Sequence, residues 1–218
     1  MPGEADDLSR LCIVTEHECQ RGEGHLEGTT TETVDMTGRA RSHAMDPTWK
    51  EALWYQFGAA IDALQSAILA CPDELWSDRS QRPEYWYLVY HTLFWLDFYL
   101  SESPEGFAPP APFGFEEMDP AGVIPERPYT KDELQAYLEH GRRKCKARID
   151  ALTDEKARER FRSGRRDFSI VELLLYNMRH VQHGAAQLNL ILRQKTDSAP
   201  RWVSRAKSVP SGGAAGAK

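Results

Sequence analysis

Three histidines occupy positions where polar side chains are uncommon, and their spacing allows metal binding. His180 and His183 are three residues apart in a segment with an apolar stripe, and Gln187 follows four residues later. In a helix this spacing places all three side chains along one edge. The rise between the two histidines is about 4.5 Å, so their imidazoles can converge on one ion. His91 lies in the middle of a strongly aromatic segment. Three neutral imidazoles, with water completing the shell, suit Zn²⁺ or Ni²⁺.

A purely structural interpretation of these histidines is also open. Two helical histidines three residues apart are common by chance, and a core histidine often only donates to a carbonyl or to a tyrosine such as Tyr87 or Tyr90. An unpaired histidine inside the aromatic segment would cost about 1–3 kcal/mol, so His91 must have some partner. The four cysteines lack a C-x-x-C spacing. They therefore predict neither a disulfide framework nor a zinc knuckle.

The elements that must position these histidines are four predicted helices. Apolar residues recur at intervals of three and four, which is the period of a helix and not of a strand. The last two helices begin with capping boxes, Thr130-Lys-Asp-Glu133 and Ser169-Ile-Val-Glu172. No strand candidate of comparable strength is present. The helices are expected over residues 47–70, 83–101, 130–152 and 169–194. The predicted fold is an all-α four-helix bundle.

A long proline-rich crossover connects the second and third predicted helices. Seven prolines between residues 104 and 128 exclude a regular helix. Five apolar side chains indicate that the segment is nevertheless packed and ordered: Phe107, Phe113, Phe115, Met118 and Ile124. The second helix is apolar almost all round, which predicts burial at the centre of the bundle or at a subunit contact. We expect the crossover to cover a pocket at the end of the bundle, lined by Trp86 and Trp95.

Composition divides the chain of 218 residues into three parts. Residues 1–44 contain no aromatic residue and carry −5 of the net charge of −6, so they are predicted to be disordered. Residues 45–197 form the predicted bundle domain, with Met45 as a possible alternative start, and residues 198–218 a flexible tail. The acidic balance argues against nucleic-acid binding through a basic surface. No signal peptide or membrane span is predicted, so a cytoplasmic location is expected.

The two histidine segments resemble those of the DinB family. Tyr-Asn-Met-Arg-His180-Val-Gln-His183-Gly-Ala-Ala-Gln187 looks like the last helix of that family, and Tyr90-His91-Thr-Leu-Phe-Trp-Leu-Asp97 is similar to the helix that carries its first metal histidine. The resemblance covers residues 46–195, including the order of the four helices. It implies an up-down-down-up bundle, often homodimeric, with a three-histidine site for a divalent metal. Relatives include transferases and isomerases that use low-molecular-weight thiols such as mycothiol or bacillithiol.

The family's ligands transfer to this sequence only in part. His91 matches the first ligand and His180 the second, whereas the position of the usual third histidine is Gly184. His183, beside it, matches a histidine often found next to the ligand. Either His183 reaches the metal, or the site consists of two histidines and water, or metal binding has been lost.

Two functions from different classes follow from this resemblance. In the first, a metal held by His91, His180 and His183 lowers the pKa of a bound thiol or water and delivers it to a small electrophile, with Gln187 orienting a water or a ligand histidine. In the second, the protein is a non-catalytic dimeric bundle, a stress-linked binding or scaffold protein whose metal site is degenerate at Gly184. No nucleic-acid or membrane partner is expected in either case.

Overall fold

The computed structural model describes residues 45–80 and 82–206, and the segment predicted to be disordered lies outside the described residues. Four long helices make up most of this part: α1 (Pro47–Ala70), α3 (Tyr85–Tyr99), α4 (Lys131–Asp150) and α6 (Ile170–Thr196). Their bounds differ from the predicted ones by no more than two residues. The shorter elements are α2 (Asp73–Trp76), the 3-10 helix η1 (Glu116–Met118), α5 (Asp154–Arg158), β1 (Arg160–Ser163) and β2 (Arg166–Ser169).

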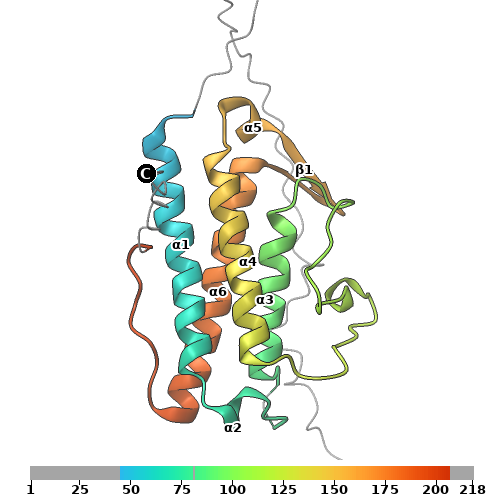
Figure 1. Ribbon diagram of the computed structural model, residues 1–218, viewed down its shortest axis with the longest axis vertical. Coiled ribbons are helices and arrows are strands. Elements are labelled where there is room, and N and C mark those ends of the chain that lie inside the picture. Colours follow the sequence, from blue (N-terminus) through green and yellow to red (C-terminus); the bar gives the residue numbers. More distant parts are fainter. Residues whose placement is uncertain (1–44, 81, 207–218) are drawn as a thin grey trace, which may run out of the picture. The chain divides into compact units, whose positions relative to one another are not determined.

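The four long helices pack side by side. Both α1 and α3 pack against α4 and α6. Figure 1 shows that α1 and α6 run in one direction and that α3 and α4 run in the opposite direction. The chain returns from the end of α3 to the start of α4 through residues 100–130, which pass along the outside of α3 (Figure 1). The crossover therefore lies beside the helix that carries His91.

The helix starts are fixed by side-chain caps that the sequence predicts. The Asp46 carboxylate accepts a hydrogen bond from Thr48 N at 2.8 Å, ahead of Pro47 in the first turn of α1. Both predicted capping boxes are present, at Thr130 for α4 and at Ser169 for α6. In each box the cap residue and the glutamate three positions later satisfy one another's backbone amides.

The aromatic helix α3 is buried within a single chain. Its residues are covered by α4 and α6 and by two phenylalanines of the crossover. The Phe107 ring packs edge-on against Phe94 at 5.2 Å, and the Phe113 ring stacks on Tyr90 at 6.0 Å. Of the two predicted environments for this helix, the structure shows central burial. Within the described residues, no helix has both the length and the apolar character needed to cross a membrane.

A β-hairpin joins α5 to α6, which corrects the prediction that the folded part contains no strand. β1 and β2 pair antiparallel, with Phe161 opposite Phe168. Gly164 occupies the turn with a φ of 58°, a conformation that glycine adopts without steric strain. The hairpin was missed because it is short and rich in arginine, so only this one aromatic pair carries the strand pattern. The fully buried ring of Phe161 anchors it beneath Phe98.

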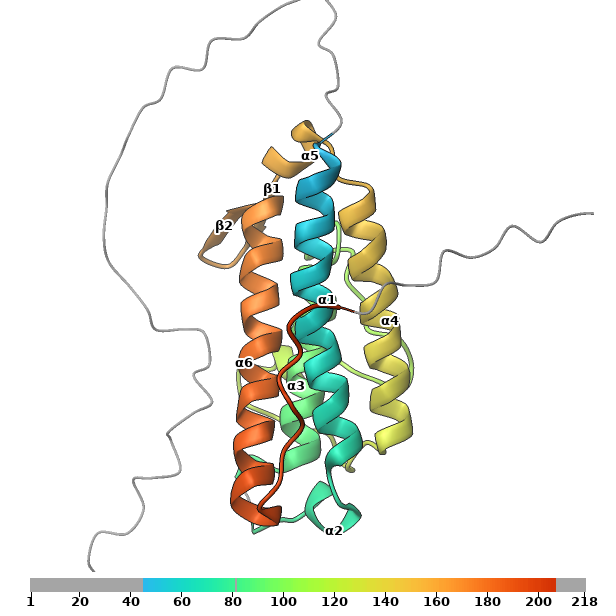
Figure 2. The ribbon, with the colours of Figure 1, turned by 90° about the vertical axis from the view of Figure 1, so that its left-hand side faces the viewer.

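The folded part extends beyond residue 197, where the sequence predicted the tail to begin. Figure 2 shows the segment after α6 turning back along α1. Ala206 N donates to Tyr55 O at 2.9 Å, and the Arg205 guanidinium lies 3.4 Å from the centre of the Tyr55 ring. Gly58 makes this contact possible, because a Cβ there would lie 2.6 Å from Ala206 Cβ. Residues 207–218 lie outside the described part of the chain.

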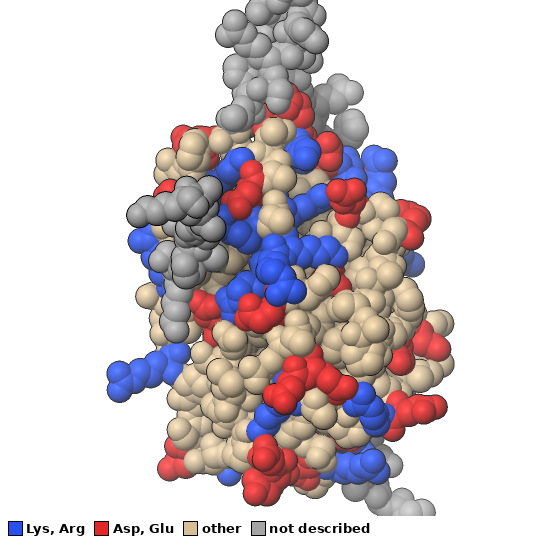
Figure 3. Space-filling model, in the orientation of Figure 1, with Lys and Arg blue, Asp and Glu red and all other residues tan. Residues whose placement is uncertain are grey.

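Several basic side chains of α4 are paired with carboxylates. Arg142 binds Asp62 of α1 and Glu139, Lys144 binds the buried Asp97 of α3 at 2.6 Å, and Lys146 binds Asp150. Figure 3 accordingly shows blue and red side chains next to one another on the face that includes α4. The pairs with Asp62 and Asp97 hold α4 to α1 and α3, and the other two lie within α4 and offset part of its positive charge.

Candidate functional site

His91 of α3 and His180 of α6 lie close together, with their rings tilted relative to one another. The centres of the two rings are 5.6 Å apart and their planes are tilted by 59°. Nε2 of His180 is buried, and the His91 side chain is 24% exposed. The structure therefore brings together the two histidines that match the family's first and second ligands.

A carboxylate from the crossover reaches the same place. Glu117, in η1, accepts a hydrogen bond from Nδ1 of His91 at 2.6 Å and from Nε1 of Trp95 at 3.1 Å, both at Oε2. Its side chain is only 4% exposed. The other oxygen, Oε1, is buried and has no hydrogen-bond partner among the described residues. A buried charge with one unsatisfied oxygen is costly in a merely structural role.

Aromatic side chains surround the histidine pair and the carboxylate. Trp95 stacks on Tyr99 with ring centres 5.6 Å apart, and Tyr99 lies 6.4 Å from the His180 ring. Burial raises the pKa of Tyr87, and the charge of Glu117 raises it further. The Tyr87 hydroxyl therefore stays protonated beside the carboxylate. These residues form an apolar surround in which electrostatic interactions are stronger than in water.

Gly184 is a point of close approach between α3 and α6. A Cβ at this position would lie 2.3 Å from Oγ1 and 2.8 Å from Cγ2 of Thr92. Thr92 follows His91 in α3, and Gly184 is one turn after His180 in α6. The missing side chain at 184 therefore lets the two helices come close enough for the imidazoles to lie close together. The close contact between the two helices explains why position 184 is a glycine.

The remaining predicted site residues differ in where they lie. His183 is exposed on α6, and Gln187 is half-buried one turn further on. Trp86 is 2% exposed, and its Nε1 donates to Glu84 at 2.7 Å, near the N-terminus of α3. Trp95 alone among the predicted pocket residues contacts the site. Glu117 was missed, because a glutamate in an irregular proline-rich segment carries no periodic signal. The only sequence feature that points to Glu117 is the pair of apolar neighbours, Phe115 and Met118.

Two of the residues present, His91 and His180, offer imidazole ligands that fit a divalent metal. Within residues 45–80 and 82–206, no three His, Cys, Asp or Glu side chains form a group that could hold an ion. The third histidine of the predicted set is thus not brought to the other two. The paired imidazoles supply two nitrogen donors of the kind that zinc and nickel accept, with water for the remaining positions.

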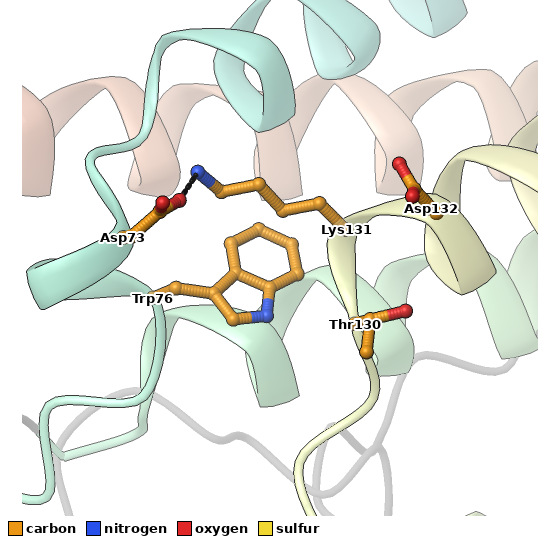
Figure 4. Close-up of a pocket in the computed structure, with 5 residues that line it drawn as sticks. All are labelled: Asp73, Trp76, Thr130, Lys131 and Asp132. Atoms are coloured by element: carbon orange, nitrogen blue, oxygen red, sulfur yellow. Dashed lines mark hydrogen bonds and ion pairs between the residues drawn. The ribbon is translucent and has the colours of Figure 1, made fainter.

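A shallow pocket of about 360 Å³ lies elsewhere, between α2 and the start of α4 (Figure 4). Lys131 extends across Trp76, and its ammonium group binds Asp73 and the carbonyl of Cys71. The charges of Lys131 and Asp73 in this pocket are therefore already paired. Trp76 packs against Tyr85 at the N-terminus of α3, away from the histidine pair.

Another histidine, His140 of α4, belongs to a different cluster. Its side chain is 38% exposed, with Nε2 3.3 Å from the carboxylate of Asp97. Asp97 is fully buried and also binds Lys144 and the Tyr137 hydroxyl. This cluster joins α3 to α4. Because His140 belongs to it and not to the histidine pair, His140 serves as a matched control for substitutions in the pair.

The two described cysteines are not thiolate nucleophiles. Burial raises the pKa of Cys71 to about 12 and also raises that of Cys145. Because only the thiolate attacks disulfides, we expect both thiols to react with Ellman's reagent at pH 8 only as the protein unfolds. The reaction is best followed in a Cys12→Ser/Cys19→Ser variant. Rapid labelling of the native protein in that variant would contradict the burial of these residues.

Comparison with known proteins agrees with the resemblance seen in the histidine segments. No curated protein and no solved structure matches the chain significantly. A family model, described as the DinB superfamily, matches residues 56–188, which is more than half of the chain. The matched range includes most of α1, all of α3 and α4, and α6 through His180 and Gly184. The chain therefore belongs to the DinB superfamily.

Proposed function

We propose that the protein binds a divalent metal, zinc or nickel, at His91 and His180 and uses it to activate a low-molecular-weight thiol or water for transfer to a small electrophile. The observation that carries this proposal is the close pair of imidazoles, 5.6 Å apart. When bound, the metal lowers the pKa of a thiol or water that it coordinates and so supplies a nucleophile at neutral pH.

The chain's own residues would support this chemistry in distinct ways. His91 and His180 supply the nitrogen ligands from two facing helices, as bundles commonly do. Trp95 and Tyr99 exclude water from one side of the pair, and the crossover covers α3 next to it. The up-down-down-up topology belongs to the same proposal and is supported by the chain directions in Figure 1. The homodimer and the cytoplasmic location stay predictions.

A second candidate function is a non-catalytic bundle that serves as a binding or scaffold protein. The observation that favours it is the missing third ligand, since Gly184 packs against Thr92 and His183 is exposed. The aromatic residues of α3 are buried within one chain, so a dimer of this kind would use another surface. Sedimentation of the full chain as a monomer would remove the dimeric form of this candidate.

Metal content tests the proposal directly. Tag-free protein, incubated with Zn²⁺ or Ni²⁺ and desalted, is expected to retain near-stoichiometric metal by inductively coupled plasma mass spectrometry. His91→Ala and His180→Ala should each lose it, because each removes one of two protein ligands. His140→Ala is the matched control and should keep it. Loss of metal in His183→Ala would identify His183 as the third ligand predicted from the sequence.

Two further results separate the candidate functions. Metal that raises the melting temperature of the wild type, and not that of His91→Ala, supports a native site, because a ligand stabilises the state that binds it. Consumption of glutathione, bacillithiol or mycothiol with a panel of electrophiles then tests transfer. A protein that retains no metal and shows no change in melting temperature would leave only the scaffold candidate.

A further inference from the structure

Glu117 is the one carboxylate that the described part of the chain places against the histidine pair, and it comes from outside the four helices. It lies 26 residues after His91, in the 3-10 turn η1. A carboxylate that is 4% exposed must be compensated by donors. Its donors include Nδ1 of His91 and Nε1 of Trp95, and the Tyr87 hydroxyl also lies beside it. Glu117 is therefore buried against the site and not merely within the crossover.

The position of η1 is fixed by packing on either side of the turn. Phe113 is buried and stacks on Tyr137 of α4 with ring centres 4.3 Å apart. The Tyr90 hydroxyl lies 3.2 Å from both the Gly114 carbonyl and the Glu116 carboxylate. Since Tyr90 directly precedes His91 in α3, the crossover is tied to the helix at the same turn that presents the histidine.

The contact with Glu117 determines which nitrogen of His91 carries a proton. An ionised carboxylate can only accept a hydrogen bond, and the indole N–H of Trp95 can only donate one. Nδ1 of His91 is therefore the protonated nitrogen of the neutral ring. Nε2 is left with the lone pair that a metal requires. A carboxylate behind a ligand histidine is a known way to fix both the tautomer and the ring orientation.

We propose that Glu117 is a positioning residue of the site: it holds the proton of His91 on Nδ1 and fixes the ring so that Nε2 is the ligand atom. The inference rests on the proposed function for the identity of the ligand, a divalent metal. The inference goes beyond the proposed function because it makes the proline-rich crossover part of the site.

The tautomer of His91 is the first test and needs no metal. In the metal-free full chain labelled with ¹⁵N-histidine, at a pH where the imidazole is neutral, the ring-nitrogen shifts of His91 should show a protonated Nδ1 and an unprotonated Nε2. His91→Ala assigns the signals by their loss. A protonated Nε2 in the wild type would overturn the proposal, whatever the variants do.

Two glutamates of the crossover provide the matched variants. Glu117→Leu removes the acceptor, and we expect the Nδ1–H tautomer to lose its dominance. Glu105→Leu changes an exposed glutamate of the same segment and should leave the His91 spectrum unaltered. Glu117→Gln keeps the shape and one neutral acceptor, and is expected to retain the Nδ1–H tautomer in larger part than Glu117→Leu. An unchanged spectrum in Glu117→Leu would also overturn the proposal.

Metal affinity is the second test and separates this inference from the proposed function. Zn²⁺ titrated calorimetrically should bind Glu117→Leu about 10–100-fold more weakly than the wild type, as for other carboxylates behind ligand histidines. Glu105→Leu should bind as the wild type does. If the wild type binds no metal, the proposed function fails and the tautomer still decides the role of Glu117. If Glu117→Leu binds as tightly as the wild type, the positioning role fails and the metal site stands.

Discussion

A histidine placed at position 184, where the family resemblance expects a third ligand, should destabilise the protein and should not complete the site. The Cβ alone would lie 2.3 Å from Oγ1 of Thr92. Overpacking of this kind costs about 1–3 kcal/mol for added methylenes, and a whole imidazole places Gly184→His at about 3 kcal/mol or more. Urea denaturation followed by circular dichroism measures the loss.

The clash cannot be relieved by a simple movement of Thr92. Its side chain is fully buried, and its hydroxyl donates to the Leu88 carbonyl at 2.7 Å. The helices α3 and α6 must therefore separate, and that separation would also part His91 from His180. We expect Gly184→His to bind metal more weakly than the wild type. Tighter binding at unchanged stability would show that the helix contact is not a constraint.

A double-mutant cycle isolates the contact. Gly184→Ala adds only the Cβ, and in an unconstrained helix it would gain about 1 kcal/mol from helix propensity. Against Thr92 we expect a net loss instead. In the Thr92→Ala background, Oγ1 and Cγ2 are gone and the nearest remaining atom is Cβ at 3.1 Å. Gly184→Ala should then be neutral or stabilising, with a coupling energy of about 1–2 kcal/mol between the two sites.

The four long helices were predictable because the signals that define each of them are local in the sequence. The capping boxes at Thr130 and Ser169 and the apolar spacing in between are local signals, and the structure follows them closely. The hairpin at Phe161 and the segment that ends at Ala206 were not predicted. Both depend on one or two contacts with residues far away in sequence, namely Phe98 and Tyr55. Such tertiary contacts leave no periodic pattern.

The residues of the candidate site also divide into those that local sequence signals predict and those that depend on tertiary contacts. His91 and His180 were predictable as a pair because each lies in a helix with a clear apolar period. The glycine at 184 could be noticed in the sequence but not explained, since its partner Thr92 lies on another helix. Glu117 could not be found at all, because only the folded crossover places it 2.6 Å from His91. Irregular segments owe their conformation to what they pack against.

The second large effect that we expect is a loss of stability in Phe113→Ala, because Phe113 packs the crossover against the bundle. Phe113 is 8% exposed, and its ring contacts those of Tyr90, Tyr129 and Tyr137. Truncation of a buried phenylalanine costs about 3–5 kcal/mol. Phe115, two residues later, is 52% exposed, so Phe115→Ala is a matched control with an expected change of about 0.5 kcal/mol. Thermal and urea denaturation of both variants measure the difference.

The same pair of variants tests whether the crossover belongs to the site or only covers it. Phe113→Ala removes the anchor that precedes η1, so Glu117 should be held less firmly against His91. We expect faster proteolysis within residues 101–130 and weaker Zn²⁺ binding in Phe113→Ala, while Phe115→Ala retains both wild-type properties. Equal proteolysis in the two variants would mean that the crossover is held elsewhere. Weaker metal binding without a change at His91 and His180 themselves would show that a residue outside the four helices controls the ligand pair.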